Sequence, residues 1–148
     1  MKTVKDLMAE KDGKVWSISP KAKVFDALKL MSDKQIGALM VMDDKGQVAG
    51  IITERDYARK IILLGKTSKE TSVEETMTPV DKMFYIKPEN TLDECMILMT
   101  AKHIRHLPVC DKGSFAGLLS IGDVVKSIIS EKEQLINQLS DYIGGKYI

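Results

Sequence analysis

The sequence is poor in cysteine and carries almost no net charge. It contains two cysteines, Cys95 and Cys110, whose spacing does not match a metal-binding pair, and a disulfide framework requires more of them. We therefore expect free, buried thiols in a reducing compartment. The 22 basic and 21 acidic side chains leave a formal charge of +1. Because this balance provides no bulk attraction to nucleic acid or to a membrane, we expect neither as a partner.

The sequence also lacks long apolar runs. No stretch reaches the roughly 18 apolar residues of a membrane span, and the segment from Met1 to Asp6 has no apolar core of the kind that a secretory signal carries. These absences predict a soluble, cytoplasmic protein. Apolar residues nevertheless make up 44% of the 148 residues, which is enough to form a buried core.

Catalytic and metal-binding patterns are missing too. No serine, cysteine or lysine nucleophile has a recognisable base and orienting group in the sequence. His103 and His106 are close in sequence, but they straddle a predicted change from helix to strand and no third ligand is near. We therefore expect no enzyme, no catalytic residues and no metal site.

The most informative feature that is present is an internal repeat. Pro20 matches Pro88, and the segment 37–41 matches 105–109, both at an offset of 68 residues. After the next turn the offset becomes 67, so that 50–56 overlays 117–123. Since a duplication tolerates one residue of difference at a loop, we expect two similar units packed about a pseudo-two-fold axis. A ligand would then be sought in the cleft between them.

Each copy has the hydrophobic pattern of a β-α-β-β-α unit, so the fold class is α/β (α+β). Alternating or continuous apolar residues indicate strands, and apolar residues three and four positions apart indicate helices. The first copy predicts strands at 15–18, 36–42 and 48–52 and helices at 22–34 and from Asp56 to Gly65; the second predicts strands at 84–86, 107–110 and 115–119 and helices at 92–102 and from about Ile121.

The domain boundaries follow from the repeat and from a polar linker. We assign residues 1–65 to the first repeat, 66–72 to the linker, 73–130 to the second repeat and 131–148 to an extension of the last helix. The extension keeps an apolar stripe of Leu135, Ile136, Leu139 and Ile143 as far as the glycines at 144 and 145. A homodimer interface is expected to cover this stripe, and the alternative is that it folds back onto Val4 and Leu7.

Two equivalent pairs of residues are candidates for ligand binding. Thr53 and Asp56 lie at one predicted helix N-terminus, where free N–H groups favour an anion and a carboxylate can accept both hydroxyls of a ribose. Ser120 and Asp123 repeat this arrangement. The alternative interpretation is that each pair is only a capping box, which satisfies the N–H groups of its own helix.

A second candidate segment differs between the copies. Arg105 and His106 precede the second apolar strand, whereas Gly37 and Ala38 occupy the equivalent positions. An arginine suits phosphate through its fork of donors, a histidine adds a pH-dependent donor, and small residues let a base approach the backbone. We therefore predict two unequal ligand positions, unless Arg105 is merely a solvated residue at the edge of its strand.

The paired segments Gly50–Asp56 and Gly117–Asp123, together with Ile104–Val109, resemble a tandem pair of CBS domains, known as a Bateman module. A Val-x-x-x-Met motif near the start of both copies strengthens the resemblance, which covers nearly the whole chain. The resemblance implies a regulatory, signal-transduction role in which the repeats bind AMP, ADP, ATP, NAD or S-adenosylmethionine. It implies no catalysis and no obligatory cofactor, and it makes AMP and NAD the first candidate ligands.

The resemblance also assigns roles to individual residues. Adenine is expected near Ile18 and Ile36 or near Ile86 and Ile104, and ribose at Asp56 or Asp123; phosphates are expected near Thr53, Arg55, Arg105, His106 and Ser120. A hypothesis from another class is a homodimeric interaction scaffold, in which the nucleotide sites are vestigial and the long C-terminal helix binds an unidentified protein target.

Overall fold

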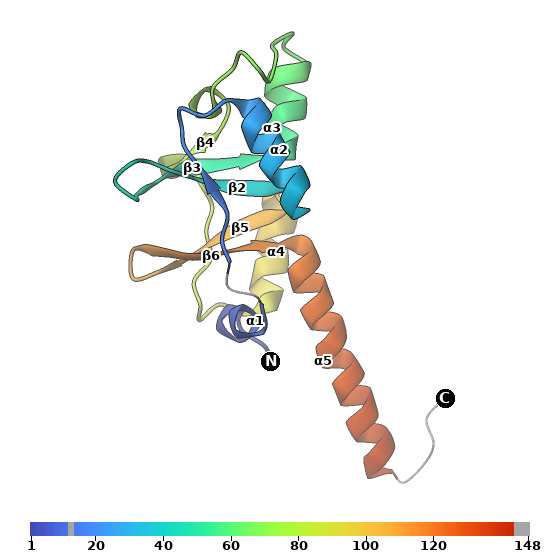
Figure 1. The fold of residues 1–148 in the computed structure, drawn as a ribbon. Coiled ribbons are helices and arrows are strands. Elements are labelled where there is room, and N and C mark those ends of the chain that lie inside the picture. Colours follow the sequence, from blue (N-terminus) through green and yellow to red (C-terminus); the bar gives the residue numbers. More distant parts are fainter. Residues whose placement is uncertain (12–13, 144–148) are drawn as a thin grey trace. The chain divides into compact units, whose positions relative to one another are not determined.

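The computed structural model describes residues 1–11 and 14–143, which form two compact units. Unit 1 comprises Met1–Gly13 and Tyr85–Ile148, and unit 2 comprises Lys14–Phe84. Both are mixed α+β units, as the sequence pattern predicts (Figure 1). The repeat in the sequence places residues 1–11 with the first copy, whereas in the structure these residues pack in the unit that the second copy forms.

Unit 2 is built on a four-stranded sheet in the order β1-β2-β3-β4. The pairing of β1 with β2 is parallel, and the other two pairings are antiparallel. The elements are β1 (Ser17–Ile18), α2 (Val24–Lys34), β2 (Ala38–Met42), β3 (Val48–Thr53), α3 (Glu54–Tyr57), a π-helical turn (Ala58–Ile62), two 3-10 turns (Val73–Glu75 and Val80–Lys82) and β4 (Thr78–Pro79).

The core of unit 2 forms where α2 lies on the sheet. The apolar residues of α2 recur at the spacing of one helix face, so Val24, Ala27 and Met31 are all buried. They belong to one hydrophobic cluster with Leu39, Val41, Ile52, Ile61 and Val73. On the surface of the same unit, the ammonium group of Lys34 lies 4.2 Å from the centre of the ring of Trp16, at cation-π distance.

Unit 1 contains a hairpin and the longest helix of the described residues. Its elements are α1 (Val4–Glu10), α4 (Leu92–Lys102), β5 (His106–Asp111), β6 (Ser114–Ser120) and α5 (Ile121–Tyr142). The strands β5 and β6 pair antiparallel, and Ile86 makes an isolated parallel bridge to Val109. The buried cluster consists of Val4, Leu7, Ile86, Leu92, Cys95, Met99, Leu107, Val109, Leu119 and Val124.

The two hairpins explain why the repeat offset changes by one residue. In unit 1, Asp111 pairs with Ser114, so Lys112 and Gly113 alone form the turn, and both have positive φ (52° and 79°). Positive φ at both central residues is typical of a tight two-residue turn. In unit 2 the turn is longer, because Met42 pairs with Val48.

The predicted elements are confirmed in order, but some bounds were wrong. The predicted strand at 84–86 is only the bridge of Ile86, and the helix predicted from Asp56 to Gly65 is the short α3 followed by a π-helical turn that ends at Ile62. The sequence pattern did not predict α1 or β4. The predicted stop of the last helix at 144 and 145 lies outside the described residues.

The first residues of each copy pack in the unit that the other copy forms. Val4 and Met8, at the start of the first copy, pack against the core of unit 1, which the second copy forms. Val73 and Met77, their equivalents in the second copy, pack against the core of unit 2. Backbone hydrogen bonds hold both segments, from the Val4 N–H to the Asn90 carbonyl (2.8 Å) and from the Val73 N–H to the Ala22 carbonyl (2.8 Å).

The two cysteines have different environments. Cys95 on α4 is completely buried, and burial raises the pKa of its thiol to about 11. Cys110 is only partly buried, so the expectation of two buried thiols was wrong for this residue. Both thiols are free.

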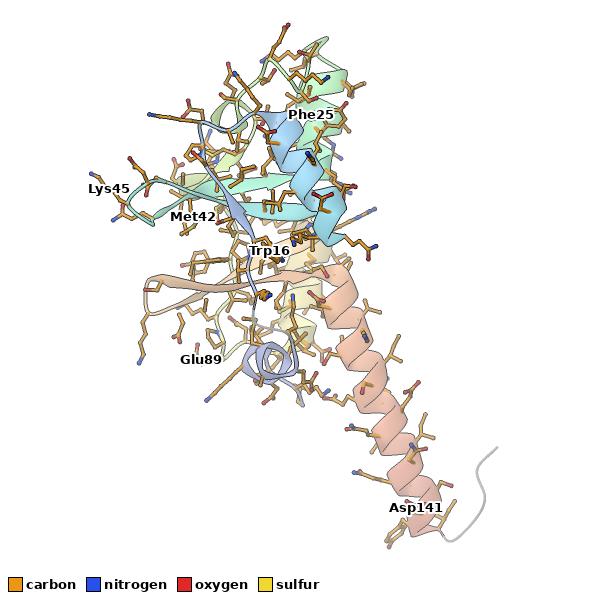
Figure 2. All side chains as sticks on the ribbon, in the orientation of Figure 1. Trp16, Phe25, Met42, Lys45, Glu89 and Asp141 are labelled. Atoms are coloured by element: carbon orange, nitrogen blue, oxygen red, sulfur yellow. The ribbon has the colours of Figure 1, made fainter. Side chains whose placement is uncertain are left out.

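The distal half of α5 leaves the rest of unit 1. Its side chains project on all sides up to Asp141 (Figure 2), and the exposed fractions of Leu135, Ile136, Leu139 and Ile143 are 54%, 41%, 55% and 71%. Residues Val4 and Leu7 are instead buried in the cluster that includes Val124 from the first turn of α5. The alternative that the stripe folds back onto this segment was therefore wrong.

We predict that Gly50→Ala and Gly117→Ala differ in stability although the two glycines are equivalent in the repeats. A β-carbon at Gly50 would collide with the backbone carbonyl oxygen of Thr78 in β4, which cannot move without breaking the sheet. A β-carbon at Gly117 would meet only the flexible end of the Met8 side chain. In urea titrations, Gly50→Ala should lower the free energy of unfolding by about 1–3 kcal/mol, and Gly117→Ala by clearly less. Equal losses would contradict the close approach of β4.

Candidate functional site

The candidate residues of unit 1 gather at the end of the hairpin that leads into α5. Ser120 is the last residue of β6 and the N-cap of α5, and it pairs across the hairpin with His106. The backbone of Arg105 is held here as well, since its carbonyl accepts the N–H of Ile121 at 2.8 Å. The structure therefore brings the two separate candidate segments of this copy together.

Unit 2 repeats this arrangement with smaller side chains. Thr53 is the last residue of β3 and pairs with Ala38, and the Gly37 carbonyl accepts the N–H of Glu54 at 3.1 Å. Ile18 lies beside Val41 in the parallel pairing, as Ile86 lies beside Val109 in unit 1. Thus Ile18 and Ile86 each lie beside the first strand of their hairpin, three residues further along that strand than Ala38 and His106.

Both aspartates close capping boxes, as the alternative interpretation predicted. The Ser120 N–H donates to Asp123 Oδ2 (2.9 Å) and the Asp123 N–H donates to Ser120 Oγ (3.1 Å); the corresponding distances for Thr53 and Asp56 are 2.9 and 3.3 Å. Boxes also occur at Thr3 and Asp6, at Ser72 and Glu75, and at Thr91 and Glu94. Because the same box recurs where no ligand is expected, it does not identify a site.

A lysine partner distinguishes Asp56 and Asp123 from those other boxes. Asp123 Oδ2 accepts from Lys11 Nζ at 2.8 Å, and Asp56 Oδ1 lies 3.2 Å from Lys60 Nζ. Each lysine also donates to a backbone carbonyl, Lys11 to Leu118 (2.9 Å) and Lys60 to Thr76 (2.9 Å). The exposed fractions of the two carboxylate side chains are 30% for Asp123 and 13% for Asp56.

The charge of Asp123 is stabilised in place. Burial alone would raise the pKa of this carboxyl, but the hydrogen bonds from Lys11 and from the Ser120 backbone outweigh it, so the pKa is lowered. The carboxylate is therefore ionised at neutral pH and acts only as an acceptor, which is the form that binds hydroxyl groups.

Sequence reasoning missed both lysines. Lys60 could have been found, since it lies four residues after Asp56 on a predicted helix. Lys11 could not, because 112 residues separate it from Asp123.

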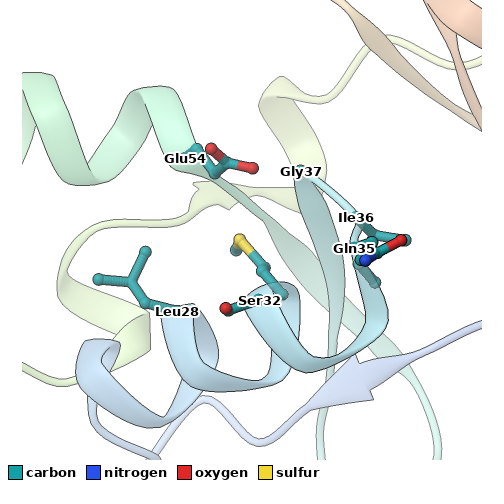
Figure 3. Close-up of a pocket in the computed structure, with 7 residues that line it drawn as sticks. Leu28, Ser32, Gln35, Ile36, Gly37 and Glu54 are labelled. Carbon is teal, nitrogen blue, oxygen red and sulfur yellow. The ribbon is translucent and has the colours of Figure 1, made fainter.

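Unit 2 also contains an open pocket of about 390 Å³, which is within the size range of small-molecule sites (Figure 3). Its lining consists of Leu28, Met31, Ser32, Gln35, Ile36, Gly37 and Glu54. Two of the candidate residues, Ile36 and Gly37, are in this lining, whereas Thr53 and Asp56 are not. The pocket thus begins beside the hairpin end and extends along α2.

Within the described residues, 1–11 and 14–143, no helix is long and apolar enough to cross a membrane. In the same ranges, no three side chains of His, Cys, Asp or Glu gather as a metal-binding group.

The CBS domain profile matches the chain twice, at residues 4–63 and 72–130. These matches cover both copies and all of the candidate residues. The chain belongs to the CBS-domain family. Proteins of this family are typically regulatory or sensor modules rather than catalysts, so the resemblance seen in the sequence is confirmed at that level.

Several CBS-domain relatives match almost the whole chain. The mitochondrial CBS domain-containing protein CBSX3 of Arabidopsis thaliana is 40% identical over 98% of this chain and 73% of its own length. CBS domain-containing protein YhcV of Bacillus subtilis is 29% identical over 98% of this chain and 91% of its own length. A protein with CBS domains from Burkholderia ambifaria, whose structure is solved, is 48% identical with a TM-score of 0.82, and the similarity covers 87% of this chain and 95% of that one.

Proposed function

We propose that this chain is a regulatory module that binds an adenosine-containing nucleotide at the hairpin end of its units, where Asp123 lies in unit 1 and Asp56 in unit 2. The observation that carries the proposal is the pair of equivalent, partly buried carboxylates, each of which has a lysine ammonium beside it. Such a group can accept both hydroxyls of a ribose through charged hydrogen bonds, which are the strong ones. The neighbouring cations would then lie close to the phosphates.

The side chains around each carboxylate would bind the phosphates and the adenine of the ligand. In unit 1 the phosphates would meet Arg105, with Ser120 and His106 as further donors, and adenine would lie near Ile86 and Ile104. In unit 2 the small Gly37 and Ala38 leave room for a base beside Ile18 and Ile36, and Thr53 and Arg55 are the donors to phosphate. Because unit 1 has His106 as a third donor in addition to an arginine and a hydroxyl, it is the stronger candidate for a phosphate-rich ligand.

AMP and NAD are the ligands that we propose first, and the purified protein provides a direct test. Absorbance at 260 nm before dialysis, followed by mass spectrometry of the released ligand, should reveal an adenosine-containing compound. If none is carried, calorimetry with AMP, ATP and NAD should detect binding. A protein that binds none of these ligands would favour the interaction scaffold with vestigial sites.

We also propose that the chain forms at least a homodimer through α5. The exposed apolar stripe of the distal helix is what a second surface would cover, since a lone protein rarely leaves such a stripe in water. A hexameric CBS-CP12 protein from cyanobacteria, with a TM-score of 0.72 and 27% identity over 84% of this chain and 70% of its own, shows that structural relatives assemble. The alternative is that the stripe binds an unidentified protein target.

Truncation after Ser130 is predicted to reduce the oligomeric state, because it removes the apolar stripe but leaves the buried cluster of unit 1 complete. Light scattering on the full-length and truncated proteins measures this directly. A control with Lys132→Ala, which changes an exposed polar residue of the same helix, should keep the full-length state. A truncated protein that keeps its oligomeric state would exclude α5 from the interface, and a monomeric full-length protein would contradict the dimer itself.

The cytoplasmic location stays a proposal. One of the similar proteins is named as mitochondrial, so a relative of this chain is placed outside the cytosol. Fractionation of the source cells, with detection of the native protein, would decide the location.

A further inference from the structure

The Lys11 side chain connects two parts of unit 1 that are far apart in the sequence. Its ammonium group donates to Asp123 Oδ2 at 2.8 Å and to the Leu118 carbonyl at 2.9 Å. The same Oδ2 also accepts the Ser120 N–H at 2.9 Å. Two donors, one of them charged, therefore converge on one oxygen of the proposed ribose carboxylate.

The position of Lys11 is set by α1. Lys11 is the C-cap of this helix, and its own N–H donates to the Leu7 carbonyl at 3.1 Å. The other end of α1 is tied to α5, because the backbone N–H of Lys2 donates to Glu131 Oε2 at 3.0 Å. Hence the ammonium is delivered to Asp123 by an anchored helix rather than by a free chain end.

Unit 2 has no counterpart of this arrangement. Its lysine, Lys60, comes from the same helical stretch as Asp56, four residues along, and it lies near Oδ1 rather than the Oδ2 that Thr53 uses. What is specific to unit 1 is that the lysine comes from a separate helix and shares one carboxylate oxygen with a backbone N–H.

We propose that Lys11 determines the ligand specificity of unit 1 by competing with ribose for Asp123 and so selecting ligands that carry a phosphate. A ribose that uses both oxygens of Asp123 must take Oδ2 from the ammonium. A neutral nucleoside offers Lys11 no new partner, so the ion pair is lost without compensation. A nucleotide offers its phosphate, which the flexible lysine side chain can reach from the same position. This inference rests on the proposed function, and it adds the residue that discriminates between nucleotide and nucleoside.

The test compares AMP with adenosine on the full-length protein and on Lys11→Met, which keeps an unbranched side chain of similar length and removes its charge. Calorimetry should show weaker binding of AMP and equal or tighter binding of adenosine, so that the preference for AMP falls by about tenfold or more. Lys11→Arg should keep most of the preference because it retains a cation. Lys5→Met, an exposed lysine on the same helix, should leave both affinities unchanged.

A measurement without ligand tests the ion pair itself. The pKa of Asp123, followed by carbon NMR of its carboxyl group, should rise in Lys11→Met because a neighbouring cation is lost. An unchanged pKa would overturn the inference, as would equal changes in AMP and adenosine affinity. If the wild-type protein binds no adenosine compound while the pKa does rise, the proposed function fails and the selection by Lys11 fails with it. Binding with an unaltered preference overturns the selection alone.

Discussion

An Asp123→Ala variant is expected to bind AMP about 30- to 1000-fold more weakly than the wild type. The carboxylate is ionised and partly buried, and a charged group that holds two ribose hydroxyls contributes on the order of 2–4 kcal/mol. Calorimetry on this variant and on Asp56→Ala would also rank the two units, and the larger loss identifies the unit that binds more tightly.

A matched control separates ligand binding from helix capping. Glu94 closes the same kind of box at the start of α4 but is exposed, so Glu94→Ala removes a capping contact without touching Asp123, Asp56 or Lys11. It should lower thermal stability slightly and leave AMP affinity unchanged. If Asp123→Ala and Asp56→Ala also leave affinity unchanged, both aspartates are only capping residues and the ribose role is wrong.

Replacing Leu107 by alanine is expected to lower the free energy of unfolding by about 2–5 kcal/mol. Leu107 is the second residue of β5, is fully buried and belongs to the cluster to which α1, α4 and α5 contribute. The deleted methyl groups would leave a cavity, because several elements fix the surrounding side chains and cannot all collapse onto it. Urea denaturation followed by circular dichroism measures the loss.

Two further variants calibrate this result. Leu39 is the equivalent residue of unit 2 and is also fully buried, so Leu39→Ala should cost a similar amount. Ile97 on α4 has an exposed fraction of 68%, and Ile97→Ala should change the free energy of unfolding by less than about 0.5 kcal/mol. A loss at Leu107 no larger than that at Ile97 would contradict the cluster.

The structure of the hairpin ends is determined largely by residues that are close in the sequence. The pairing of Ser120 with Asp123, the helix that follows and the tight turn at Lys112 and Gly113 all depend on residues within about four positions of each other. Such local features can be recognised from the sequence alone. Because the same features occur in both copies, the family and the α+β units were predicted correctly from the sequence.

The short elements were predicted less well because their structure depends on what they pack against. Thr78 and Pro79 form a strand only because β3 lies beside them with Gly50 at the contact. Likewise α1 takes its place from the core that it covers, and nothing in its own residues says which copy that core belongs to.

The sequence by itself determined the duplication, the strand and helix order of each copy, and the two carboxylates at helix starts, because these follow from periodicity and from contacts between near neighbours. Only the tertiary structure decided that the N-terminal segment packs with the second copy and that Lys11 reaches Asp123. Those two groups are 112 residues apart, and no local pattern encodes a contact over that separation. It forms because burial of Val4 and Leu7 fixes α1 against the core of unit 1, which places the ammonium beside the carboxylate.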